Sequence, residues 1–229
     1  MKNIYNEEYT LGQIVRDHSF ILMDTCVLSQ SIGSYKNIDT LSGKALVIEE
    51  ENQFRLDLMH YLEMDSPIFI TPLVYDEYAV RVNSNYIEPI ETLDSRDQVA
   101  RRKLLENKIK NGRFEERKLL KLFEKGKIFI LEEENQRYDS LSGRYFWFKN
   151  EKAIERFKIK EPLSKTDFDL LISAAVLSYS EESLALLTSD YGIIKAWSYL
   201  CKDIKIDSNK FELFIRKFPL IFEKKSAFH

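Results

Sequence analysis

Apolar runs of strand length alternate along this chain with longer segments in which apolar residues recur at helical spacing. This alternation is typical of βαβ units, in which helices connect the strands of a parallel sheet. The apolar runs predict strands at Phe20–Met23, Ile68–Ile70, Lys127–Leu131, Leu184–Leu187 and Ile204–Ile206. The periodic segments predict helices at about Ala45–Glu63, Leu73–Val82, Arg96–Glu124, Ser164–Ser180, Ile193–Leu200 and Lys210–Lys217.

These elements indicate one α/β domain, and a chain of 229 residues suits a single domain of this class with insertions. No linker rich in Gly, Ser or Pro divides the chain, and its seven glycines form neither a P-loop nor a dinucleotide-binding motif. We therefore predict one domain over residues 1–229, with insertions at about 31–64 and 83–161. The second insertion is expected to hold the third strand and a long helix.

The composition, 44% hydrophobic and 31% charged, is that of an ordinary globular protein. No apolar run reaches the roughly 20 residues of a bilayer span, and the first residues are too polar and acidic for a signal peptide. Cys26 and Cys201 are the only cysteines and form no CxxC pair, which argues against a disulfide framework or a thiolate zinc site. We expect a cytoplasmic protein without membrane contact. With a net charge of −3, any binding of nucleic acid must depend on a local basic patch.

Four acidic residues lie at places expected to meet at the carboxyl edge of the sheet, where α/β proteins have their functional sites. Asp24 and Asp190 each follow a predicted strand, Glu77 comes soon after another, and Asp167 opens a long apolar helix. Because ligands bind beyond the carboxyl ends of parallel strands, these carboxylates are expected to converge there on a cation. A cluster of oxygen ligands with no Cys or His beside it suggests Mg²⁺ or Mn²⁺, and such ions usually serve phosphate chemistry.

Each of these acids also has a purely structural interpretation. Asp24 and Asp190 precede helical patterns, where Asp is a favoured N-cap. Ser164 and Asp167 have the spacing of a capping box, and Glu77 fits a solvated helix residue. Capping accounts for each acid separately but not for four acids at one edge of a sheet, so we favour convergence.

Four segments resemble the signatures of the PIN domain family, in the same order along the chain. In that family the first strand ends in Asp-Thr, and a second strand leads into a helix with an acidic ligand. A Leu-Ser-x-x-Asp helix and a Thr-x-Asp-Tyr motif follow. The corresponding segments here are Phe20–Thr25, Ile70–Glu77, Leu163–Asp169 and Leu186–Tyr191. The resemblance covers these segments and their order, about half of the chain. The similarity is closest to archaeal-type PIN domains, including that of the nuclease that trims small-subunit ribosomal RNA.

The resemblance implies a three-layer PIN-like fold, in which helices flank a central, mainly parallel sheet. It implies that one or two Mg²⁺ or Mn²⁺ ions bind and activate water for hydrolysis of single-stranded RNA, leaving 5′-phosphate and 3′-hydroxyl ends. The implied metal ligands, which are also the catalytic residues, are Asp24, Glu77, Asp167 and Asp190. Residues expected to support these ligands are Thr25, Ser164, Asp169 and Thr188.

Asp167 and Asp169 compete for the third ligand position, because two residues along a helix are about 200° apart and cannot both point at one metal. We assign Asp167, which lies at the start of the helix and matches the Leu-Ser-x-x-Asp signature. Asp169 is expected to support the site or to face outward.

The chain departs from the family pattern at Cys26, where Asn or Ser often follows Asp-Thr, and at Lys195, where Asn is frequent. Neither residue is expected to bind the metal. The insertions exceed those of a minimal PIN toxin, and a Cys-rich zinc module of the ribosomal-processing type is absent from the sequence. The resemblance therefore indicates the catalytic class better than the target.

A basic segment is the first candidate for binding RNA. Between Gln98 and Lys127 lie eleven basic and four acidic residues, which make a local positive field. The same pattern fits a solvated amphipathic helix whose leucines pack inward, and both interpretations can hold at once. The candidate phosphate contacts are Arg101, Arg102, Lys108, Arg117 and Lys118.

The aromatic stretch Arg144–Lys149 is the second candidate, because its rings could stack on unpaired bases. A run this apolar is more often a packed strand or an oligomer contact, and we favour that interpretation.

The sequence thus predicts a metal-dependent PIN-type endoribonuclease, with RNA as its substrate. Two alternatives stay open: a toxin ribonuclease held in check by an antitoxin, and a catalytically silent PIN-like module that binds nucleic acid or protein. A homodimer and another protein partner are also open. A haloacid-dehalogenase-type phosphatase is disfavoured, because Asp24-Thr25-Cys26 lacks the second Asp of Asp-x-Asp.

Overall fold

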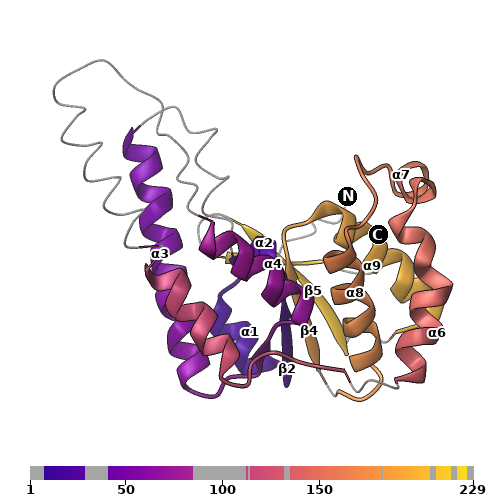
Figure 1. Ribbon diagram of the computed structural model, residues 1–229, viewed down its shortest axis with the longest axis horizontal. Coiled ribbons are helices and arrows are strands. Elements are labelled where there is room, and N and C mark those ends of the chain that lie inside the picture. The colour runs from indigo at the N-terminus through magenta and orange to yellow at the C-terminus, as the bar shows by residue number, and fades with distance from the viewer. Residues whose placement is uncertain are drawn as a thin grey trace, which may run out of the picture.

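The computed structural model describes residues 8–28, 41–84, 112, 114–131, 135–181, 183–206, 210–217 and 221–225 (Figure 1). The strands are β1 (Glu8–Tyr9), β2 (Phe20–Met23), β3 (Ile68–Phe69), β4 (Leu184–Thr188), β5 (Phe211–Lys217) and β6 (Ile221–Lys225). The helices are α1 (Leu11–Asp17), α2 (Thr25–Leu28), α3 (Leu41–Glu63), α4 (Pro72–Asn83), α6 (Gln136–Tyr145), the 3₁₀ helix η2 (Phe146–Lys149), α7 (Glu151–Phe157), α8 (Lys165–Leu177) and α9 (Tyr191–Ile204). Residues 114–124 are also helical.

The strands form one mixed sheet in the order β1-β6-β5-β4-β2-β3. The centre is parallel, since β2 pairs with both β3 and β4, and β4 pairs with β5. The β6 strand turns back antiparallel to β5, and β1 is antiparallel to β6. The carboxyl ends of β2, β3, β4 and β5 therefore lie at the same edge of the sheet.

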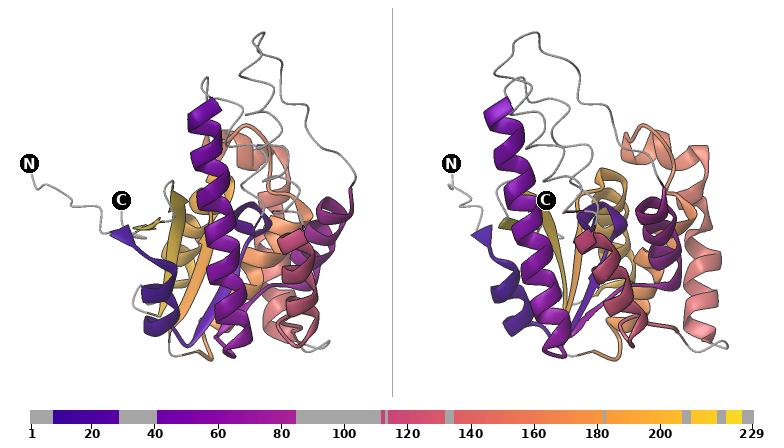
Figure 2. Two further views of the ribbon diagram at one scale, coloured as in Figure 1. Left: turned by 90° about the vertical axis from the view of Figure 1, so that its left-hand side faces the viewer. Right: turned by 60° about the vertical axis from the view of Figure 1, so that its left-hand side comes forward.

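Helices cover both faces of the sheet, so the fold has three layers, with the sheet between two layers of helices. In Figure 1, α3 lies on one side of the sheet, and α8, α9 and α6 lie on the other. The left view of Figure 2 shows α3 standing in front of the strands. In the described part of the chain, no helix is both long and apolar enough to cross a bilayer.

Burial on both faces explains the continuous apolar sequence of the central strands. All residues of β2 and β4 are buried, as are nine residues of α8, which packs between the sheet and its neighbouring helices. The predicted strands Phe20–Met23 and Leu184–Leu187 are confirmed, and β3 covers the first two residues of the predicted Ile68–Ile70. The predicted helices at 45–63, 73–82, 164–180 and 193–200 are confirmed as parts of α3, α4, α8 and α9.

Two predictions near the C-terminus are wrong. Ile204–Ile206 is not a strand, because α9 continues to Ile204 and ends at Lys205, whose backbone is left-handed with φ of 55°. The predicted helix Lys210–Lys217 is instead β5, which pairs along its length with β4. A short segment this rich in apolar residues fits either period, and pairing with the buried central strand decides in favour of the strand.

Three further predictions need correction. The predicted strand Lys127–Leu131 is reduced to a single parallel bridge between Ile128 and Ile70. The sheet is parallel at its centre as predicted, but its edge is antiparallel, since β6 pairs with β5 and β1 with β6, and neither β1 nor β6 was predicted. The aromatic stretch at 145–148 is not a strand, since it ends α6 and forms η2. Helices α1, α6 and α7 were not predicted either. The insertions proposed at about 31–64 and 83–161 stay a prediction.

A buried ion pair attaches α3 to the sheet. Arg216 on β5 donates to Glu51 Oε2 at 2.7 Å and to the Val27 carbonyl at 2.5 Å. Its guanidinium also lies 3.9 Å from the ring centroid of Phe54. A second pair, Arg55 with Glu116 at 3.1 Å, joins α3 to the helical segment 114–124.

We predict that Arg216→Ala lowers the free energy of unfolding by about 3 kcal/mol or more, because it leaves the Glu51 carboxylate buried without its cation. Urea denaturation measures the change. Arg144→Ala is the matched control, since Arg144 is half exposed in its ion pair with Asp203 and should cost less than ~1 kcal/mol. Equal losses in the two variants would contradict this account of α3.

Candidate metal centre

Asp24 is buried at the carboxyl end of the central strand β2, with 2% of its surface exposed. The parallel register pairs Met23 with Leu187, so the residues that follow the two strands lie side by side. The Asp24 backbone N–H continues this ladder by donating to the Leu187 carbonyl at 3.0 Å. The backbone hydrogen bond therefore fixes the position of Asp24 at the end of β2.

Thr188 joins the ends of β2 and β4. Its hydroxyl donates to Asp24 Oδ2 at 2.6 Å and accepts the Asp190 N–H at 2.9 Å. The Asp190 carboxylate in turn caps α9, since its Oδ1 accepts the Ile193 N–H at 2.9 Å. The predicted N-cap role of Asp190 is confirmed, and it uses one of the two carboxylate oxygens.

Asp167 lies in the first turn of α8, within the predicted capping box. Its N–H donates to Ser164 Oγ at 3.0 Å, and its Oδ2 accepts the Ser164 N–H at 3.2 Å. Its other oxygen is not needed for the cap. Glu77 is exposed on α4, which packs against both α2 and α8.

The four acids interact through their charges. Burial raises the pKa of Asp24 to about 7, and the negative charges of Asp167 and Asp190 add to that rise. Burial also raises the pKa of Asp167, and the charges of Asp190 and Glu77 contribute. Asp24, Asp167 and Asp190 are thus within electrostatic reach of one another, and Glu77 reaches Asp167, so that like charges oppose ionisation.

The carboxylates do not form a finished coordination shell. Across the residues with described positions, no three His, Cys, Asp or Glu side chains are arranged to hold a metal ion. The capping bonds account for part of this, because each turns one oxygen of Asp167 or Asp190 toward a helix N-terminus. The donor atoms and their charge suit Mg²⁺ or Mn²⁺, but their spacing is that of a loose cluster.

Cys26 corrects the expectation that no Cys lies beside the acids. Its thiol donates to Asp24 Oδ2 at 2.7 Å and accepts the Ser189 N–H at 3.0 Å. Burial and the Asp24 charge raise the pKa of the thiol well above its usual range, so it stays protonated as a donor. The nearness of Cys26 to Asp24 in sequence was the available signal for this contact.

The supporting residues divide into two groups. Thr25 and Thr188 are buried beside Asp24, and Ser164 binds Asp167. Asp169 instead accepts the Tyr138 hydroxyl at 2.6 Å, which directs it toward α6. Of the two competing residues, Asp167 is the one whose charge reaches Asp24 and Glu77.

The basic candidates are only partly described. Arg117 and Lys118 are exposed on the helical segment 114–124, whose Leu119, Leu120 and Phe123 are buried. This is the amphipathic pattern that the sequence suggested. Arg101, Arg102 and Lys108 lie outside the described residues.

Gly192 is a site residue that sequence reasoning missed. A Cβ added there would come within 2.9 Å of both Asp190 Oδ1 and Leu163 Cδ2. The absent side chain lets the start of α9 approach the segment before α8. Its position two residues after Asp190 was the only signal in the sequence.

Comparisons of the chain with family models, with curated proteins and with solved structures give no match.

We predict that Asp24→Asn stabilises the metal-free protein at pH 8. As the pH rises, the unfolded chain ionises Asp24 near the ordinary aspartate pKa of 3.8, whereas the folded protein retains the proton until about 7. Wild-type stability therefore falls between about pH 4 and 7, and the gain from Asp24→Asn should grow over the same window. Its upper limit is ~4 kcal/mol, because one pKa unit corresponds to about 1.4 kcal/mol.

Urea denaturation in a chelator at pH 4.5, 6 and 8 measures this gain. Asp76→Asn is the control, because Asp76 is exposed on α4 and should show no such window. A gain from Asp24→Asn that does not change with pH would argue against a strained carboxylate.

Proposed function

We propose that the protein is a divalent-metal-dependent endoribonuclease of PIN type that hydrolyses single-stranded RNA to 5′-phosphate and 3′-hydroxyl ends. The supporting observation is that Thr188 joins Asp24 to Asp190 by hydrogen bonds at the carboxyl edge of the sheet, where Asp167 interacts electrostatically with both acids and with Glu77. Three of these acids come from the starts or ends of different elements, and the fourth comes from α4. A cation would relieve the repulsion that raises the pKa of Asp24.

The residues fit Mg²⁺ or Mn²⁺ in kind, because these ions prefer carboxylate oxygens. When bound, one or two such ions supply an activated water and neutralise the phosphate charge. Asp24 would hold the ion from the buried side, and Asp167 and Asp190 would use the oxygens that their capping bonds leave over. Glu77 would close the set from α4, where its exposed side chain has room to turn.

The chain's own residues hold this arrangement in place. Thr188 and Cys26 each donate a hydrogen bond to Asp24 Oδ2, which orients the carboxylate. The capping bonds fix Asp167 and Asp190 on two helix N-termini, whose dipoles stabilise negative charge. These bonds hold the three Asp residues at the edge of the sheet, and binding of a cation would draw their carboxylates closer together.

A cytoplasmic setting is part of the proposal, because both cysteines are free thiols. RNA is the proposed substrate, and an antitoxin or a second copy of the chain is a further partner to be tested.

We predict that the wild-type protein with Mg²⁺ or Mn²⁺ cuts a labelled single-stranded RNA, and that Asp24→Asn lowers the rate roughly 100-fold or more without loss of folding, since the substitution removes the buried negative charge that the cation needs. Gel analysis of product ends and circular dichroism measure the two effects. Cleavage by Asp24→Asn at the wild-type rate, or wild-type cleavage in excess chelator, would refute the metal mechanism.

A second substitution tests the position of Asp190. Gly192→Ala should displace the Asp190 carboxylate or Leu163 and lower the cleavage rate roughly 10-fold or more, while the protein stays folded. Gly143→Ala is the matched control, since a Cβ there meets nothing within 4 Å and should favour the helix. If both variants cleave RNA equally well, the close contact at Gly192 does not matter for the site.

A further inference from the structure

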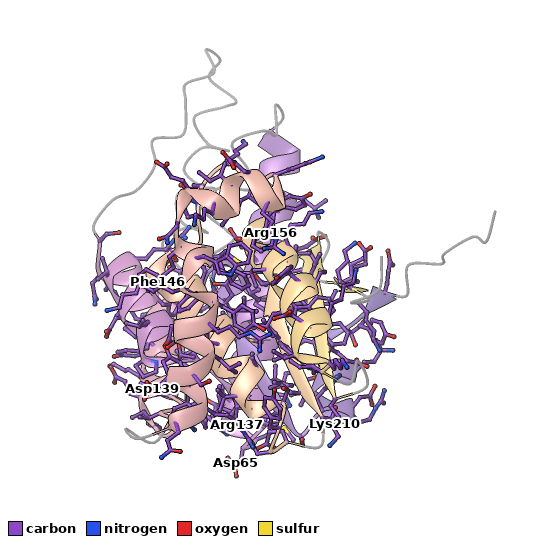
Figure 3. The ribbon with its side chains drawn as sticks, turned by 90° about the vertical axis from the view of Figure 1, so that its right-hand side faces the viewer. Asp65, Arg137, Asp139, Phe146, Arg156 and Lys210 are labelled. Carbon is purple, nitrogen blue, oxygen red and sulfur yellow. The ribbon has the colours of Figure 1, made fainter. Side chains whose placement is uncertain are left out.

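Two exposed aromatic rings, each paired with a lysine, are linked to the segments that carry Asp167 and Asp190. Phe146 begins η2 and is 54% exposed. Lys149 Nζ lies 4.4 Å from the Phe146 ring centroid and 4.6 Å from that of Phe168, the residue after Asp167. Figure 3 labels Phe146 on the outer side of the molecule, close to the end of α6 that leads to α7.

Tyr191 forms the second pair. It is the first residue of α9, directly after Asp190, and its side chain is 55% exposed. Lys195 lies one helical turn further, with Nζ 5.0 Å from the Tyr191 ring centroid. The cation of Lys195 thus accompanies an exposed ring.

The two pairs are joined through one residue of the chain. The Leu163 N–H donates to the Phe148 carbonyl of η2 at 3.1 Å. The Leu163 side chain also lies against Gly192, at the start of α9. Both η2 and the start of α9 thus contact Leu163, in the segment that leads into Asp167.

We propose that Phe146 and Tyr191 stack unpaired bases of single-stranded RNA while Lys149 and Lys195 contact the adjoining phosphates. This inference rests on the proposed function and defines where the substrate lies. An exposed ring with a cation beside it matches the two parts of a nucleotide, since bases stack on aromatic faces and phosphates attract ammonium groups. The neighbouring carboxylates repel a phosphate chain without their metal, so the lysines also offset that repulsion.

This assignment revises the packed-strand interpretation of the aromatic stretch. Tyr145 and Phe148 are buried, and they pack with Trp147, Phe157 and Tyr199. Phe146 differs from these rings, because it points outward with Lys149 over it. The packed rings thus support η2, and Phe146 is the ring of this stretch that lies at the surface.

The test measures binding of a fluorescein-labelled, ten-nucleotide oligouridine to the Asp24→Asn protein with Mg²⁺, so that cleavage does not interfere. Phe146→Ala and Tyr191→Ala, each added to Asp24→Asn, should weaken binding roughly 5- to 100-fold, as expected for losing one stacked base. Phe146→Tyr and Tyr191→Phe keep a ring and should bind within about twofold of the parent. Replacing Lys149 and Lys195 by Ala should reduce the dependence of affinity on salt.

Tyr179→Ala is the matched control. Tyr179 is 46% exposed and has Arg137 4.5 Å from its ring, so it has the same local chemistry. It follows the far end of α8, roughly 20 Å from Asp167 for a helix of 13 residues. Its loss should change RNA affinity less than about twofold.

The outcomes separate this inference from the proposed function. If wild-type protein cleaves RNA but Phe146→Ala and Tyr191→Ala bind RNA like the parent, the stacking surface is refuted and the nuclease stands. If those substitutions weaken binding while wild-type protein never cleaves RNA, the stacking surface stands and catalysis is refuted. Unchanged RNA binding with loss of self-association in sedimentation would assign these rings to a protein interface and overturn the proposal.

Discussion

The candidate site is built around a carboxylate, Asp24, that is buried near other acidic residues at the end of the central strand. Burial and the charges of Asp167 and Asp190 raise its pKa to about 7. Hydrogen bonds from Thr188 and Cys26 offset only part of this effect. A buried carboxyl group of this kind is more stable with a proton or a cation than as a bare anion, which is the physical basis of the proposed metal site.

The rest of the fold keeps that unfavourable group in place. The parallel pairing of β2 with β4 puts Asp24 beside Thr188, and the starts of α8 and α9 bring Asp167 and Asp190 to the same edge. On the other face, the buried pair of Arg216 and Glu51 joins α3 to β5 and reaches the Val27 carbonyl in α2. Helix α2, which follows Asp24, is thus held to the sheet by the hydrogen bond from Arg216 to Val27.

The sequence predicted the centre of the fold and the elements on which the four acids lie, because both follow from short-range patterns, whereas their convergence on a cation stays a prediction. Continuous apolar runs mark strands buried on two faces, and an Asp after such a run marks the carboxyl edge. The C-terminal strands could not be predicted in this way, since Phe211–Lys217 becomes a strand through pairing with β4. Contacts such as Cys26 with Asp24, or Gly192 with Leu163, depend on side-chain placement that no local pattern encodes.

The central claim is that the four carboxylates close around a divalent cation. Anomalous diffraction from crystals grown with Mn²⁺ tests it most directly, because the signal locates the metal without reference to activity. We predict an anomalous peak with Asp24 and at least two of Glu77, Asp167 and Asp190 as direct or water-mediated ligands. A fully bound crystal in which Mn²⁺ lies elsewhere, with the four acids still apart, would contradict the account.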